Sequence, residues 1–162
     1  MHRILVPVDG SAHSLKALAI AGDLALRQHA QIALLHVLAL ERPSGEMLEF
    51  IDPNIIGPRL ARSLEAAGKK ASRAVPETLL RDMGERILDH ALERVRGRAI
   101  DAIKLAIETG DPAEVILDIQ RRIASTTIVM GCRGGRTATA SAFGSVSNTV
   151  FQNADCTCVA VK

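Results

Sequence analysis

Apolar residues gather in five short runs that are separated by longer amphipathic stretches. The runs cover residues 3–8, 31–37, 102–108, 126–130 and 156–161. Each run is rich in Ile, Val, Leu or Ala, as is typical of strands that are buried on both faces. Strands of this kind belong to parallel sheets with helices on both sides. The pattern therefore predicts five parallel strands.

The stretches between the runs carry apolar residues at helical spacing. Ser11 and Asp111 stand where N-cap side chains are expected, and Pro76 and Pro112 stand at helix starts. The alternation of strands and helices predicts one α/β domain over residues 1–162, built on a single open, twisted, parallel sheet. Helices are expected over residues 11–28, 58–71, 76–96, 112–124 and 145–152.

A region with weak periodicity and several prolines, at about residues 41–75, interrupts this alternation. We read it as an insert in the domain. Because it follows the second strand, it leaves from the edge of the sheet where ligands bind. We expect a mobile cover over the ligand or an extra subunit contact, and a solvated insertion is the alternative.

A glycine-rich segment follows the fourth predicted strand. Gly131 and Gly134 are three residues apart, and Gly144-Ser145 follows after nine intervening residues. Backbone N–H groups that wrap around phosphate need residues without a Cβ. Gly144 and Ser145 also open the last predicted helix, whose free N–H groups and positive dipole end favour an anion. The spacing predicts a phosphate site, with a flexible loop followed by a helix cap as the alternative.

Other motifs for nucleotide binding, hydrolysis and zinc binding do not occur in the sequence. The P-loop pattern G-x-x-x-x-G-K-[ST] does not occur, and the turn after the first strand lacks G-x-G-x-x-G. No G-x-S-x-G elbow occurs, and the five histidines form no zinc-binding pair. Asp9 is either a residue that faces a ligand or a turn residue that ends the first strand. We therefore predict no catalytic residue and no metal ligand.

The three cysteines suggest no metal site. Cys156 and Cys158 share one face of a strand, but no third ligand lies near them in the sequence. We expect both to be buried strand residues. Cys132 is expected to be a plain loop thiol.

Three segments of the chain resemble the universal stress protein family. The glycines form the pattern G-x2-G-x9-G-[S/T], which is similar to the ATP-binding signature of that family. The opening, ILVPVDGSAHSLKALAIAGDLA, is similar to the family's first strand, its Asp and its first helix. Residues 154–161, ADCTCVAV, approach the common ending A-x-C-P-V-x-V-V, with Thr157 at the place of the Pro. The resemblance covers most of the chain outside the insert.

This resemblance implies a Rossmann-like fold with strand order 3-2-1-4-5, a homodimer, and a site for ATP with Mg²⁺ bridging the phosphates. By position, the end of the first strand would line the adenosine, and the backbone at the end of the second would hold the adenine. The glycine-rich segment would follow the ribose and phosphates. The residues assigned to the nucleotide are Pro7, Val8, Asp9, Val37, Met130, Gly131, Arg133, Gly134, Gly144, Ser145, Val146 and Ser147.

The homodimer is expected to form through residues 156–161, which are an outer strand in the implied order. An outer strand carries unpaired backbone groups, and this run has neither charge nor Pro to blunt it. Val159 and Val161 are expected on one face, and Cys158 and Ala160 on the other. Placing Pro at Val159 is expected to split the dimer. A monomer whose edge is covered by the insert is the alternative.

Composition narrows the function classes. The net charge is only +2, from 20 basic and 18 acidic residues, and the aromatic residues are three Phe. Both facts argue against nucleic acid binding. No apolar run approaches the ~18 residues of a membrane span, and the odd cysteine count fits a reducing, cytoplasmic location.

The sequence thus predicts an ATP-binding stress-response or regulatory protein with little or no turnover, rather than an efficient enzyme. Two alternatives stay open. One is a slow ATP-hydrolysing or adenylate-transferring enzyme that uses the same site. The other is a dimerisation module that binds no nucleotide.

Overall fold

A five-stranded parallel sheet forms the centre of the computed structural model. The structure describes residues 2–38, 51–68, 75–98, 100–132 and 144–162. The strands are β1 (Arg3–Pro7), β2 (Gln31–Leu38), β3 (Ala102–Thr109), β4 (Thr127–Gly131) and β5 (Thr157–Val161). Neighbouring strands follow the order β3-β2-β1-β4-β5, and each pair is parallel. The predicted fold class and strand order are confirmed.

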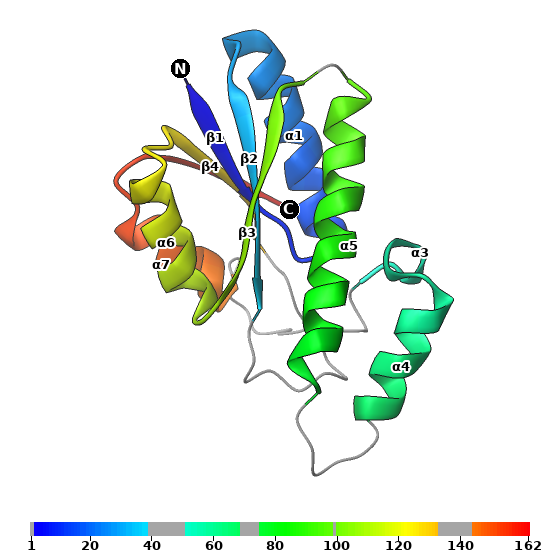
Figure 1. The fold of residues 1–162 in the computed structure, drawn as a ribbon. Helices are drawn as coiled ribbons and strands as arrows, with labels where there is room; N and C mark the ends of the chain where they lie inside the picture. The colour runs from blue at the N-terminus through cyan, green and yellow to red at the C-terminus, as the bar shows by residue number, and fades with distance from the viewer. Residues whose placement is uncertain (1, 39–50, 69–74, 99, 133–143) are drawn as a thin grey trace.

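Helices cover both faces of this sheet (Figure 1). In Figure 1, α1 and α5 lie on one side of the strands and α6 and α7 on the other, while α3 and α4 lie beside α5. None of the helices in the described ranges is long and apolar enough to cross a membrane. The helices are α1 (Ala12–Gln28), α3 (Pro53–Ile56), α4 (Pro58–Gly68), α5 (Glu77–Arg96), α6 (Pro112–Arg122) and α7 (Ser145–Asn153).

Alternation along the strands divides the core between the two faces. In β1, the side chains of Ile4 and Val6 pack with the α1 and α5 layer, whereas Leu5 packs with the α6 and α7 layer. All three are fully buried. Because both faces are covered, the strands read as continuous apolar runs, which is why the sequence located them.

Two predicted N-caps are present. The Ser11 hydroxyl accepts a hydrogen bond from the Ser14 amide at 3.2 Å and starts α1. The Asp111 carboxylate accepts from the amides of Ala113 at 2.9 Å and Glu114 at 3.1 Å and starts α6. Each cap supplies an acceptor for N–H groups that the first helical turn leaves unpaired.

The described part of the insert is helical and packs against the domain. The sequence predicted α4 within residues 58–71 but missed the four-residue α3. Ile55, Ile56, Leu60 and Leu64 are buried in the same core cluster as α1 and α5. Burying one such side chain contributes about 1.5–3 kcal/mol. Over residues 51–68 the insert is therefore not a solvated insertion; residues 41–50 and 69–74 lie outside the described ranges.

The hydrogen bonds of the outer strand β5 show that Val159 was the wrong choice for a proline that removes a donor to a partner strand. The Thr157 amide donates to the Thr126 carbonyl at 3.2 Å, and the Val161 carbonyl accepts from the Cys132 amide at 2.8 Å. Residues two apart in a strand direct their backbone groups to the same edge. The Val159 amide therefore faces β4, and a proline there would break the β4–β5 ladder. The amides of Cys158 and Ala160 face outward instead.

Candidate functional site

The carboxyl ends of β1 and β4 meet at the centre of the sheet. The two strands are neighbours, with Leu5 opposite Ile128, although α1 to α6 separate them in the sequence. The chain winds outward in opposite directions from this point, because β2 and β3 lie to one side and β5 to the other. Ligands of open parallel sheets bind at this type of position.

Six of the predicted site residues come together at this edge. Pro7 ends β1, and Val8 and Asp9 follow it; Met130 and Gly131 end β4. Val37 is the sixth residue. Pro7 pairs with Leu35 and β2 continues to Leu38, so Val37 lies just beyond the end of β1 at the same edge. Val8 and Met130 are buried, whereas Asp9 is exposed.

The turn between β1 and α1 is shaped by Asp9 and Gly10. The Asp9 carboxylate accepts a hydrogen bond from the Ser11 amide at 3.0 Å, so Asp9 serves as the turn residue that the sequence allowed. Gly10 has φ +81°, and a Cβ on it would lie 3.2 Å from the Ile51 and Ile87 side chains. The insert residue Ile51 therefore lies directly over this turn.

Gly131 lets the end of β4 approach the first turn of α1. A Cβ at this position would lie 2.9 Å from the Cβ of His13 and 3.0 Å from its carbonyl carbon. Real Cβ atoms do not approach other atoms this closely without displacing them. The first glycine of the motif is therefore required by packing between helix and strand.

Hydrogen bonds to the Cys132 carbonyl join the two ends of the glycine-rich segment. This carbonyl accepts hydrogen bonds from the Gly144 amide at 2.6 Å and from the Ser147 hydroxyl at 2.9 Å. The Ser147 hydroxyl also lies 3.0 Å from the Gly144 carbonyl. Ser147 is only 2% exposed, so its side chain is part of this clamp. Arg133 and Gly134 lie outside the described residues.

The N-terminus of α7 directs backbone N–H groups toward this region. Asn148 is the first residue whose amide bonds back to the turn before it, at 3.0 Å from the Gly144 carbonyl. The amides of Ser145, Val146 and Ser147 precede it and have no helical carbonyl to bond. Gly144 has no side chain to cap them, and Ser145 is exposed. Such a terminus is suited to an anion.

His36 lies beneath the site and was not singled out from the sequence. Its Nδ1–H donates to the Val8 carbonyl at 2.7 Å, and its Nε2 is buried with no hydrogen-bond partner in the described structure. Gly84 of α5 leaves room for the ring, because a Cβ there would lie 2.7 Å from the His36 Cδ2. Burial lowers the pKa of His36 below 6.5, against the opposing effects of Val8 and Asp9. The neutral ring therefore stabilises the chain at the end of β1 through its hydrogen bond to Val8.

Two of the cysteines differ from the sequence expectation. Cys156 and Cys158 are half-buried rather than buried, because β5 is an outer strand. Cys132 directly follows β4, outside any helix or strand as predicted, and is 1% exposed. Desolvation is the main cause that raises the pKa of the Cys156 thiol to about 11.

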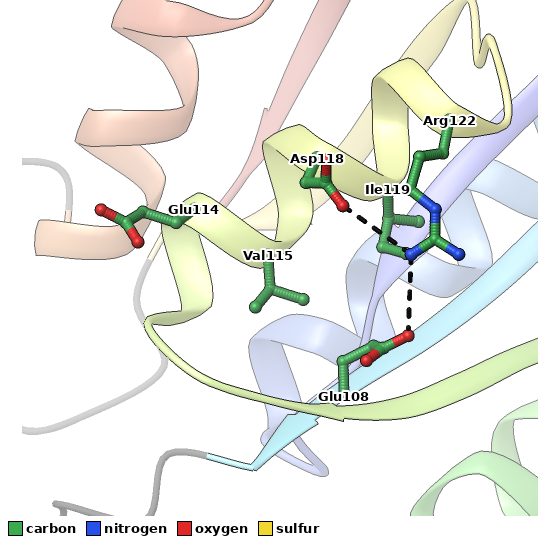
Figure 2. Close-up of a pocket in the computed structure, with 6 residues that line it drawn as sticks. All are labelled: Glu108, Glu114, Val115, Asp118, Ile119 and Arg122. Carbon is green, nitrogen blue, oxygen red and sulfur yellow. Dashed lines mark ion pairs between the residues drawn. The ribbon is translucent and has the colours of Figure 1, made fainter.

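A surface pocket lies elsewhere, between the end of β3 and α6 (Figure 2). Its lining includes three carboxylates and one guanidinium, with Arg122 Nη1 at 3.9 Å from Glu108 Oε1 and 3.7 Å from Asp118 Oδ2. The excess of negative charge would repel phosphate. This pocket therefore does not compete with the β1–β4 edge as an anion site.

Sequence comparisons identify relatives that match nearly the whole chain. The model described as "Universal stress protein family" matches residues 1–162. The stress response protein NhaX of Bacillus subtilis is 29% identical over 171 aligned positions, which cover 99% of this chain and 97% of NhaX. The universal stress protein YxiE of Bacillus subtilis is 27% identical over 164 positions, with 99% of each chain covered.

Solved structures share the fold at low identity. UspA from Lactobacillus plantarum has a TM-score of 0.64 at 23% identity, with 99% of this chain and 97% of that chain covered. The universal stress protein from Archaeoglobus fulgidus in complex with dAMP has a TM-score of 0.67 at 18% identity, covering 100% and 98%. A family protein from Arabidopsis thaliana with AMP bound has a TM-score of 0.62 at 18% identity, covering 100% and 92%.

Proposed function

The chain belongs to the universal stress protein family, and from this premise we propose that it binds ATP at the β1–β4 edge and serves as a stress-response protein with little turnover. The observation that carries the proposal is the N-terminus of α7, where the amides of Ser145 and Val146 have no partner among the described residues and the Gly144 amide bonds to the Cys132 carbonyl at the end of β4. Solved members of the family hold AMP and dAMP, so the ligand class is an adenine nucleotide.

The described residues suggest a division of roles within the nucleotide site. Pro7, Val8 and Asp9 would line the adenosine, and the backbone of Val37 would contact the adenine. The amides of Ser145 and Val146, with the Ser145 hydroxyl, would hold the phosphates. Mg²⁺ would bridge the phosphates, because the charge of ATP exceeds what one helix terminus neutralises.

The remaining assigned residues support the site in different ways. Gly131 and Met130 would border the ribose, and Gly144 would admit the phosphates to the start of α7. Arg133 and Gly134 are assigned to the phosphates by the motif alone, since the structure does not describe them. Ser147 would act indirectly, because its hydroxyl is bonded to the Cys132 carbonyl.

We expect slow turnover because the described residues around the proposed site offer few groups that could act as a general base. Among the described residues that we place around the nucleotide, the only general-base candidate is Asp9, whose carboxylate already accepts the Ser11 amide. Hydrolysis should stay well below the ~1–1,000 s⁻¹ of typical enzymes. Phosphate release above about one per second, lost in Asp9→Asn, would favour the enzymatic alternative.

The insert and the outer strand suggest two further features. Ile51 packs over Gly10, next to Asp9, which supports the proposal that the insert covers the nucleotide. ATP should then slow proteolysis within residues 41–75, and unchanged cleavage would contradict a cover. The outward amides of Cys158 and Ala160 support a homodimer formed by β5 pairing with its own copy about a two-fold axis.

Nucleotide released from the purified, denatured protein tests the proposal. Mass spectrometry should identify ATP or another adenine nucleotide. In the apo protein, Mg-ATP at 100 times its dissociation constant should add about 2.7 kcal/mol of stability, and so raise the melting temperature by several degrees. No co-purified nucleotide together with no thermal shift at millimolar Mg-ATP would reject it in favour of a dimerisation module.

A further inference from the structure

Two thiols lie side by side on the outer strand, away from the proposed nucleotide site. Cys156 precedes β5 and Cys158 lies within it, and both side chains pack on the α6 and α7 side of the sheet. Each is half-buried, and neither forms a disulfide. Because the two residues are two positions apart along an extended segment, their side chains are neighbours on this face.

The hydrogen bonds that the structure gives these two thiols are weak. Cys156 Sγ lies 3.7 Å from the Thr157 carbonyl, and Cys158 Sγ lies 3.7 Å from the Cys156 carbonyl. Both distances are long even for a hydrogen bond that a thiol donates. Binding of a metal by the two sulfurs would therefore break no strong hydrogen bond among the described residues.

The spacing of the pair disfavours a disulfide. Residues two apart in an extended strand have Cα atoms about 6.6 Å apart. Relaxed disulfides have Cα separations of roughly 4.4–6.8 Å, most often near 5.5–6 Å. A disulfide here would lie at the outer limit and would strain β5, which pairs with β4 from Thr157 to Val161. A bridge of one atom between the sulfurs fits the spacing better, because two metal–sulfur bonds of ~2.3 Å span ~4.6 Å.

The number and type of ligands near the two thiols determine which metal could bind. No group of three or more His, Cys, Asp or Glu side chains that could hold a metal occurs in the described part of the chain. A structural zinc site requires four ligands in a tetrahedron, and two are missing here. Cu(I) is a soft cation that prefers thiolates, and two thiolates in line are enough for it.

We propose that Cys156 and Cys158 form a two-thiolate site for Cu(I). Binding is a ligand exchange without redox change: Cu⁺ and two thiols give one bis-thiolate complex and two released protons. Because two protons leave, the affinity should rise about 100-fold per pH unit near neutrality.

Cu(I) titration of the reduced, full-length protein without oxygen tests this site, with the coloured Cu(I) chelator bicinchoninate as competitor. We expect one Cu(I) per chain. Cys156→Ser and Cys158→Ser should each weaken binding at least 100-fold. Cys132→Ala is the matched control and should bind as the parent does, because Cys132 is buried away from this pair. Melting curves of all variants check that each one is folded.

Four outcomes would overturn the assignment. They are parental Cu(I) affinity in the Cys156→Ser, Cys158→Ser double variant, no Cu(I) retained by the parent against the chelator, and one Cu(I) per two chains. The fourth is Zn²⁺ binding as tight as Cu(I) with the same dependence on the two cysteines, because it would imply a fuller ligand set. None of these outcomes bears on nucleotide binding, so the two proposals fail separately.

Discussion

The Ser147 hydroxyl donates a 2.9 Å hydrogen bond to the Cys132 carbonyl, and this bond joins the start of α7 to the end of β4. The two residues lie near the two ends of the glycine-rich segment, so the bond fixes where that segment leaves and rejoins the domain. It also separates two serines that the sequence treats alike: Ser147 is buried and Ser145 is exposed.

Ser147→Ala should therefore destabilise the protein. The change removes a buried hydrogen bond and should lower the free energy of unfolding by about 1–2 kcal/mol. Ser145→Ala is the matched control and should stay within about 0.5 kcal/mol of the parent, because its side chain is exposed. Urea unfolding measures both variants. Equal losses in the two variants would show that the clamp is not formed.

Gly131→Ala should destabilise the protein even without nucleotide. The added Cβ would lie 2.9 Å from the His13 Cβ, so β4 and α1 must separate. Crowding of this kind typically costs about 1–3 kcal/mol. Gly97→Ala is the control, since Gly97 has a helical φ of −58° and its Cβ would lie no closer than 3.3 Å to the Glu93 carbonyl oxygen. A Gly131→Ala variant as stable as the Gly97→Ala variant would refute the packing account.

His36 should make stability depend on pH. Its folded-state pKa is lowered, so the unfolded chain takes up the proton first as the pH falls below 6.5. Stability should then decline by at most about 1.4 kcal/mol per pH unit until the folded-state pKa is reached. His36→Gln should remove this part of the decline and His2→Gln should not, because His2 is exposed. Unfolding at pH 7.5 and 5.5 gives the comparison, and identical slopes in the parent and His36→Gln would contradict it.

Ala160→Pro should split the proposed dimer without unfolding the protomer. The Ala160 amide faces outward, so the proline removes a donor that only a partner strand would use. Val159→Pro is the contrasting variant: its amide faces β4, so it should lower the melting temperature of the protomer. Light scattering measures the mass of each species. A monomeric parent, or an Ala160→Pro variant that stays dimeric, would refute pairing through β5.

The sequence predicted features that depend on local chemistry. The apolar runs located the strands because both faces of the sheet are buried, and Ser11 and Asp111 marked helix starts because capping acts over three residues. It missed α3, which is only four residues long and is held by contacts with α5. The fit of His36 against Gly84 joins positions on separate elements, which periodicity does not connect. The exposure of Cys156 and Cys158 depends on their strand being at the edge of the sheet.

Calorimetric titration with Mg-ATP of the apo parent and of Gly144→Val tests the central claim most directly. Gly144 has an extended backbone at φ −71°, so valine is compatible with the chain itself, but its branched side chain would block phosphate at the start of α7. We predict one ATP per chain for the parent and no measurable binding for the variant, with the fold intact by circular dichroism. Parental affinity in the folded variant, or a parent that binds no ATP, would contradict a nucleotide site at this edge of the sheet.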